Sequence, residues 1–167
     1  PYYHFGESAT NYVDQGPQNS RGFRALKVWL ALRHAGAAGY RGMIADDIAL
    51  AGMLADIVKR HAELEFQTHD LSITTWRYVP SDLRARTAET AVAAYLDVLN
   101  KELLSRIQSG GEAFVSNAVL RGRYVLRACI VNFNSCASDM HAVAGISARL
   151  GREVDGELRP AELRAGR

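Results

Sequence analysis

The chain has 167 residues, of which 48% are hydrophobic and 23% are charged, and its formal net charge is +2. A chain of this length can bury one sizeable core, and this balance is typical of an ordinary globular protein. The basic residues are spread along the sequence, whereas binding nucleic-acid phosphates needs a concentrated basic face, so we expect no nucleic-acid partner. No apolar run is long enough to span a bilayer and no signal peptide is visible, so we expect a cytoplasmic protein without membrane contact.

The two cysteines, Cys129 and Cys136, cannot form a disulfide framework, and their spacing matches no zinc motif. Reduced thiols in a cytosolic protein are the favoured interpretation. The sequence starts without Met, on the aromatic and loop-like residues 1–6 (PYYHFG). We therefore expect a piece that starts in the middle of a longer protein.

Residues 1–19 have no steady hydrophobic period and are rich in Gly, Asn, Gln, Thr and Ser, which predicts a loop. A helix is predicted from Arg21, with Asn19 or Ser20 as its N-cap and Gly36 as a left-handed stop. Its apolar residues lie on nearly every side, and such a helix is buried on all sides. These apolar residues are Phe23, Leu26, Val28, Trp29, Leu30 and Leu32. We therefore expect more protein around this helix than the chain itself can supply.

The next predicted elements are one helix and two strands. The helix covers 39–60, where apolar residues fall at three- and four-residue steps. The first strand candidate is short, 64–66, and a polar turn follows it. The second, 71–79, is rich in β-branched and aromatic residues, and Pro80 ends it.

A third helix is predicted over 92–107, and Gly110-Gly111 ends it. Two strands follow, 113–120 and 124–131, joined by an Arg-Gly-Arg turn of the length and composition that favour a hairpin. These segments add a second pair of strands to the first.

A last helix is capped by Asn134 or Ser135, and the charged tail from Gly151 is expected to fray. The order is thus helix, helix, strand, strand, helix, strand, strand, helix. Segregated hairpins and helices predict an α/β protein of the α+β type, with a mostly antiparallel sheet and helices on one face.

Residues that indicate chemistry are few. The sequence contains no Gly-rich phosphate loop and no nucleophile elbow, and none of its five histidines pairs with another at metal-ligand spacing, so no metal site is predicted. Arg127 stands out because it interrupts the apolar strand 124–131 (YVLRACIV), where a charge has to reach an edge or bind an anion. It could grip a carboxylate with two parallel hydrogen bonds, or form a salt bridge with an acidic residue of a neighbouring helix. Spacing alone favours neither.

Three blocks of the sequence, in order, resemble the group II pyridoxal-phosphate-dependent amino-acid decarboxylases, which act on aromatic amino acids, histidine or glutamate. The first block is SRGFRALKVWLALRHAGAAGYRGMI at 20–44, with the core Phe-Arg-x-Leu-Lys-x-Trp. The second is LSITTWRYVP at 71–80, and the third is GRYVLRACIVN at 122–132. The resemblance extends over about residues 1–152.

The resemblance implies the C-terminal part of a fold-type-I enzyme that has a large domain and a small C-terminal domain. Residues 1–19 would be a mobile active-site loop and linker, and 20–38 a helix that returns into the large domain. Residues 39–152 would be the small domain, and 153–167 a frayed tail. The implied enzyme is a cytoplasmic homodimer that uses pyridoxal 5'-phosphate to decarboxylate an L-amino acid to an amine.

The resemblance also assigns two functional residues. Arg127 matches an arginine that engages the substrate carboxylate. Tyr3, or less closely Tyr2, matches a tyrosine in a mobile loop that closes over the active site across the dimer interface. In the family, this catalytic tyrosine helps to protonate the intermediate after carbon dioxide leaves.

The family's cofactor-holding residues have no counterpart in this sequence. Its Schiff-base lysine follows an Asn/His pair and precedes a Trp, whereas Lys27 is followed by Val. The histidine and the aspartate that contact the cofactor ring have no match either. The chain alone is therefore expected to bind no cofactor and to be inactive. The alternative is a non-enzymatic α+β binding or regulatory module that is stable by itself.

Overall fold

The computed structural model of the chain describes residues 16–17 and 22–164. The chain divides into two compact units, Pro1–Tyr40 and Arg41–Arg167. Helix α1 (Arg24–Arg60) begins in the first unit and ends in the second. The two units differ sharply in how their apolar residues are packed.

The described part of the first unit consists mainly of the start of α1. Gly36 lies within it at φ 66° and ψ 174°, outside the helical region, so two helical segments meet there as predicted. Glycine adopts a positive φ without a steric penalty, which explains its place at this kink. The large apolar side chains of the unit are exposed, with Phe23 at 73% and Trp29 at 56%. The described residues of this unit thus form no core of their own.

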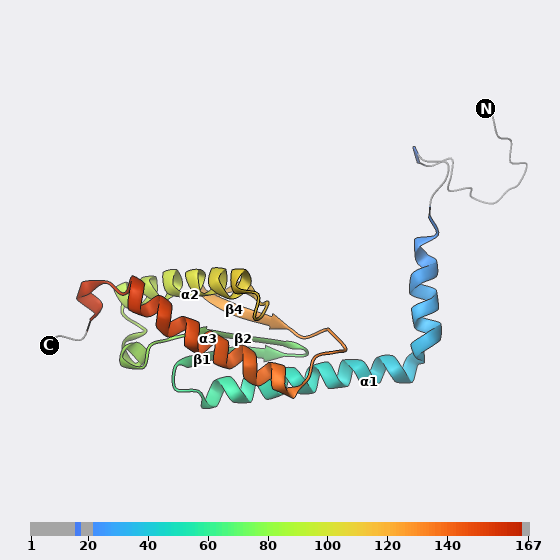
Figure 1. Cartoon of the computed structure of the whole chain (residues 1–167), viewed down its shortest axis with the longest axis horizontal. Helices are drawn as coiled ribbons and strands as arrows, with labels where there is room; N and C mark the ends of the chain where they lie inside the picture. The colour runs from blue at the N-terminus through green and yellow to red at the C-terminus, as the bar shows by residue number, and fades with distance from the viewer. Residues whose placement is uncertain (1–15, 18–21, 165–167) are drawn as a thin grey trace, which may run out of the picture. The chain divides into compact units, whose positions relative to one another are not determined.

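The second unit contains a four-stranded sheet covered by helices (Figure 1). After α1, its elements are β1 (Leu64–Asp70), β2 (Ile73–Tyr78), the 3-10 helix η2 (Ser81–Arg86), α2 (Thr90–Gly110), β3 (Ser116–Leu120), β4 (Arg123–Cys129), α3 (Ala137–Leu158) and the 3-10 helix η3 (Ala161–Leu163). The strand order is β1-β2-β4-β3, and each neighbouring pair is antiparallel. The predicted fold class is confirmed.

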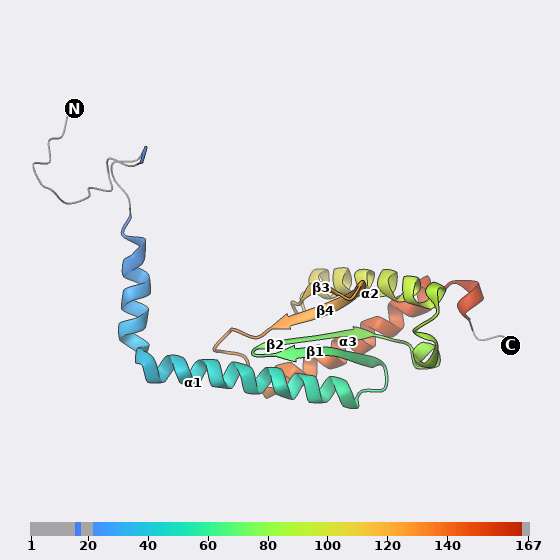
Figure 2. The same ribbon diagram turned by 180° about the vertical axis from the view of Figure 1, so that it is seen from behind.

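The helices lie on one face of the sheet. Thr74 Oγ1 donates a hydrogen bond of 2.8 Å to the carbonyl oxygen of Ala51 in α1. Gly151 of α3 packs so closely on the Tyr78 ring that a Cβ there would collide with it. Figures 1 and 2 agree, because α3 lies in front of the strands in one view and behind them in the other. Since side chains alternate along a strand, the even-numbered residues of β2 face the helices and the odd-numbered residues face away.

The core lies between the sheet and the helices. Its fully buried members include Leu54, Leu64, Trp76, Leu96, Leu99, Leu103 and Leu126. The amide of Asn100, also buried, accepts a hydrogen bond from Tyr78 N at 2.7 Å and donates one to Tyr78 O at 2.9 Å. The pairing of β2 with β4 ends at Trp76. The Asn100 side chain therefore satisfies the backbone N–H and C=O of Tyr78, which a neighbouring strand would otherwise satisfy.

All four strands differ in extent from the expectation: β2 and β4 by one or two residues at each end, and β1 and β3 by more at one end. β1 continues to Asp70 instead of ending at 66, and its last residues are exposed. It is an edge strand, so its polar end needs no apolar alternation to remain in the sheet. β3 begins at Ser116 instead of 113. For β1 and β3, strand pairing, which the local sequence does not show, decided where the strand begins or ends.

The predicted fraying of the C-terminal tail is wrong for the described residues. Helix α3 continues to Leu158, well past Gly151. Val154 is fully buried, and Leu163 of η3 is only 4% exposed. The segment's charged composition suggested a solvated tail, but its few apolar residues are inserted into the core. The second unit therefore extends beyond the predicted domain end at 152.

Charged residues of the same segment form a network with α2 and η2. Arg159 Nη2 donates to Asp82 Oδ1 at 3.0 Å and to Asp155 Oδ2 at 2.7 Å. Tyr95 donates to Asp155 Oδ1 at 2.6 Å. The hydrogen bonds from Arg159 hold the pKa of Asp82 below its usual value, while burial, followed by the bond to Asp155, raises the pKa of Tyr95. These contacts fasten the end of α3 to the rest of the unit.

Candidate functional site

Arg127 of β4 lies in a polar row that crosses the sheet. Its Cα partner on β2 is Thr75, its partner on β3 is Ser116, and Thr75 is paired in turn with Thr68 on β1. Directly paired residues place their side chains on the same face, with Cβ atoms about 4.5–5.5 Å apart. We call Thr68, Thr75, Arg127 and Ser116 the Arg127 row. Because Thr75 is an odd-numbered residue of β2, the row lies on the face away from the helices.

The Arg127 side chain is half-buried, and its backbone is held by Ser116, whose Oγ donates to Arg127 O at 3.2 Å. Within residues 22–164 its guanidinium forms no ion pair. The salt bridge to a neighbouring helix, one of the two roles left open by the sequence, thus has no partner in this part of the chain. The guanidinium remains available to an anion from elsewhere.

A second arginine lies on the same face. Arg77 is fully buried, and its Nε donates to Glu65, its partner on β1. The two terminal nitrogens of Arg77 have no hydrogen-bond partner among the described residues. Gln67 also donates to the Glu65 carboxylate, at 2.7 Å, and Glu65 forms an ion pair with Arg77. This face therefore carries two arginines and one paired carboxylate, and the net positive charge favours an anionic ligand.

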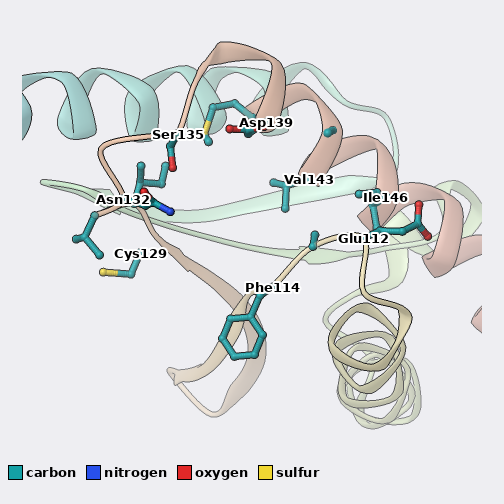
Figure 3. Close-up of a pocket in the computed structure, with 13 residues that line it drawn as sticks. Glu112, Phe114, Cys129, Asn132, Ser135, Asp139, Val143 and Ile146 are labelled. Atoms are coloured by element: carbon teal, nitrogen blue, oxygen red, sulfur yellow. The ribbon is translucent and has the colours of Figure 1, made fainter.

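A cavity of about 450 Å³ lies at the end of β4 (Figure 3). Its labelled lining residues are Glu112 and Phe114 before β3, Cys129 and Asn132 at and after the end of β4, and Ser135, Asp139, Val143 and Ile146 at or near α3. Cys129 lies on the same face of β4 as Arg127, whereas Asp139, Val143 and Ile146 belong to α3, so the part of the lining that α3 supplies lies on the helix side of the sheet. Both Cys129 and Cys136 are unpaired thiols.

No family model matches the chain. Its sequence is similar to the aromatic-L-amino-acid decarboxylase of Bacillus atrophaeus, with 31% identity over 149 residues, 89% of this chain and 30% of the relative. It is 32% identical over 122 residues to tyrosine decarboxylase 2 of Arabidopsis thaliana, which covers 72% of this chain and 21% of that protein.

Two solved structures have the same fold. Oryza sativa TDC with PLP matches at a TM-score of 0.69 with 26% identity, over 86% of this chain and 30% of the other. Mouse CSAD matches at a TM-score of 0.78 with 21% identity, over 89% of this chain and 32% of the other. The chain is related to the group II pyridoxal-phosphate-dependent amino-acid decarboxylases. It spans about a third, or less, of the length of these group II relatives.

The described residues do not fit the cofactor of the group II enzymes. A pyridoxal-phosphate site needs a lysine for the Schiff base and an acidic partner for the ring nitrogen. The cavity lining contains no lysine. The three described lysines, Lys27, Lys59 and Lys101, are all exposed, and Lys59 pairs with Asp56 at 3.4 Å. No chemical step through the cofactor can be assigned to this segment.

The structure brings Arg127 together with its row but does not place the other predicted site residue. Tyr3 and its alternative Tyr2 lie outside the described residues, as does most of the predicted loop 1–19. The described ranges contain no group of three or more His, Cys, Asp or Glu residues that could hold a metal ion. In the same ranges, no helix has both the length and the apolar character needed to cross a membrane.

Sequence reasoning missed the neighbours of Arg127. Thr75 and Arg77 stand at alternate positions of a strand that is buried on both faces, so no apolar alternation marks which side they occupy. Ser116 gave no signal either, because a serine in a strand is common. Their link to Arg127 depends on strand register, which the sequence pattern alone did not specify.

Proposed function

We propose that this chain is the substrate-carboxylate-binding segment of a pyridoxal-phosphate-dependent decarboxylase that converts an L-amino acid to an amine. The observation that carries the proposal is the half-buried side chain of Arg127, whose guanidinium has no ion-pair partner within residues 22–164. The proposal is supported by the sequence relatives, which are an aromatic-L-amino-acid decarboxylase and a tyrosine decarboxylase. They also make an aromatic L-amino acid the first substrate to test.

In this proposal Arg127 receives the carboxylate that leaves as carbon dioxide. The planar guanidinium can donate two parallel hydrogen bonds to the two carboxylate oxygens, which sets both the position and the orientation of the substrate. Arg77 is fully buried and ion-paired with Glu65, so it does not contact the substrate, and Arg127 supplies the positive charge that binds it. The cofactor and its lysine belong to the rest of the enzyme.

The remaining parts of the proposal concern the whole enzyme. It is a cytoplasmic homodimer, residues 1–19 form its active-site loop, and Tyr3 supplies a proton after carbon dioxide has left. The exposed apolar residues of the first unit pack in the large domain, which would remove a surface that includes Phe23 and Trp29 from water. The isolated 167-residue chain is inactive.

The test replaces Arg127 by Ala in the complete enzyme, with L-tyrosine and L-tryptophan as first substrates. Losing a charged bidentate contact costs about 2–5 kcal/mol, so the Michaelis constant should rise at least about 30-fold. Arg127→Lys should restore only part of the lost substrate affinity, because an ammonium group cannot form the two parallel hydrogen bonds of a planar guanidinium. Arg123→Ala is the control, since it removes an exposed arginine from the same strand. Unchanged kinetics for Arg127→Ala would reject the assignment.

Tyr3→Phe tests the loop assignment in the same enzyme. Turnover should fall, or product should be diverted into side reactions, while cofactor absorbance stays unchanged. Tyr2→Phe is the matched control, because it removes a hydroxyl from the adjacent residue. Normal turnover and product purity with Tyr3→Phe would remove Tyr3 from the proposal, and the reverse pattern would assign the role to Tyr2.

A non-enzymatic binding module is the second candidate. One observation favours it: residues 41–164 include a buried core with its own hydrogen-bonded network. The exposed helix of the first unit weighs against it, because a stable module would not expose so much apolar surface. Sharp thermal unfolding of the 167-residue chain without binding of an apolar dye would favour the module. Dye binding or aggregation would favour the enzyme segment.

A further inference from the structure

Thr75 stands directly opposite Arg127 in the Arg127 row, and only 3% of its surface is exposed. Thr68, on the other side of Thr75, is exposed at the edge of the sheet. Arg127 therefore has one buried and one half-buried hydroxyl-bearing neighbour, Thr75 on β2 and Ser116 on β3. The two neighbours use their hydroxyls differently.

The hydroxyl of Thr75 is directed towards β1. Its Oγ1 accepts a hydrogen bond from Thr68 N at 3.0 Å and lies 2.7 Å from Thr68 Oγ1 and 3.3 Å from Thr68 O. One assignment satisfies all three contacts, with Oγ1 accepting from the Thr68 amide and hydroxyl and donating to the Thr68 carbonyl. A hydroxyl has one donor and two acceptor positions, so this assignment uses its full capacity.

These contacts favour the rotamer of Thr75 that directs Oγ1 towards β1. The register of β1 against β2 shifts between Phe66 and Thr68, and Thr75 bonds to the strand directly after that shift. With Oγ1 turned towards β1, the methyl group must occupy a different staggered position. Because the hydroxyl is already bonded to β1, it is not free to bond to Arg127. The methyl group is the part of Thr75 that can contact the Arg127 side chain on the neighbouring strand.

We propose that Thr75 is a positioning residue for Arg127: its hydroxyl is fixed to β1, and its methyl group supports the arginine stem so that the guanidinium meets the substrate carboxylate already oriented. This inference rests on the proposed role of Arg127. Ser116 contributes from the other side by holding the Arg127 carbonyl. Ordering a long side chain is a cost of binding, and a neighbour that orders it beforehand removes part of that cost.

The test compares two adjacent threonines in the complete enzyme. Thr75→Ala removes both the hydroxyl and the methyl group beside Arg127. Thr74→Ala is the matched control, because Thr74 is also buried and hydrogen-bonded, but on the helix face. We expect Thr75→Ala to raise the Michaelis constant about three- to tenfold, with kcat within about twofold of wild type. Thr74→Ala should lower the melting temperature without changing the Michaelis constant.

Two further measurements separate positioning from a general loss of structure. The inhibition constant of the amine product, which has no carboxylate, should be the same for Thr75→Ala and wild type. In an Arg127→Ala background, adding Thr75→Ala should change the Michaelis constant no further, because the residue acts through Arg127. Equal weakening of substrate and amine, or a full additional effect without Arg127, would overturn the proposal.

Thr75→Ser serves if Thr75→Ala does not fold. It keeps the hydroxyl bonded to β1 and removes only the methyl group, so we expect a rise of about twofold or more in the Michaelis constant. An unchanged value would overturn the inference. Arg127→Ala distinguishes a failure of the proposed function from a failure of the role given to Thr75. If Arg127→Ala leaves the Michaelis constant unchanged, the proposed function fails. If it raises the constant and both Thr75 variants do not, only the role of Thr75 fails.

Discussion

The two tryptophans of the chain show how differently its two units use apolar residues. Trp29 in the first unit is 56% exposed and lies 5.8 Å below the guanidinium carbon of Arg33, whereas Trp76 in the second unit is completely buried. The first unit has an apolar helix without a core, and the second forms a core from its own sheet and helices. Apolar composition therefore predicts that a segment will be buried, but not that its own chain will bury it.

The largest expected effect comes from comparing two leucines, one in each unit. Leu96 is fully buried in α2, and Leu30 is 51% exposed in α1. Leu96→Ala should lower the free energy of unfolding by about 2–5 kcal/mol, because it leaves a cavity in the core. Leu30→Ala should change it by less than about 0.5 kcal/mol in the 167-residue chain. Urea unfolding measures both, and similar losses would show that the first unit has a core of its own.

The second test sharpens the description of the C-terminal segment with two glycines of α3. A Cβ at Gly151 would collide with the Tyr78 ring, while nothing lies within 4 Å of one at Gly156. Gly151→Ala should therefore destabilise the unit by about 1–3 kcal/mol. Gly156→Ala should stabilise it by about 0.5–1 kcal/mol, as expected in a helix. Stabilisation by both substitutions in thermal unfolding would mean that α3 does not pack on the sheet at Gly151.

The smallest effect concerns Tyr95, which fastens α2 to the end of α3. Its pKa is raised in the folded state, first by burial and then by its hydrogen bond to Asp155. A raised pKa means that the folded state holds the proton more tightly, so this contribution is complete below pH about 10 and is lost as the pH rises towards the folded pKa.

Tyr95→Phe should cost about 1 kcal/mol at pH 8, the usual net value of one hydrogen bond. The difference between the variant and wild type should shrink above pH 10, as the wild-type tyrosine loses its advantage. Urea unfolding at pH 8 to 11 measures the difference. A constant difference across this range would show that Tyr95 does not titrate with unfolding.

Local sequence information predicted much of the order of the elements. The stop at Gly36, the two pairs of strands and the helix between them depend on periodicity, glycine and proline, whose effects act over a few residues. The sequence also marked Arg127, because a charge inside an apolar strand stands out without any knowledge of its neighbours. Three ordered blocks were enough to identify the relationship to the group II decarboxylases.

Only the tertiary structure decided what surrounds these features. The Arg127 row joins residues from four strands through their register, and α3 continues past Gly151 because Val154 enters a core built by other elements. The buried amide of Asn100, which comes from α2, forms the hydrogen bonds with the Tyr78 backbone that a neighbouring strand would otherwise form. Each of these features depends on partners distant in the chain, and hydrophobic period and turn signals report only on near neighbours. The sequence alone therefore determined that Arg127 was unusual, and the fold determined which residues can position it.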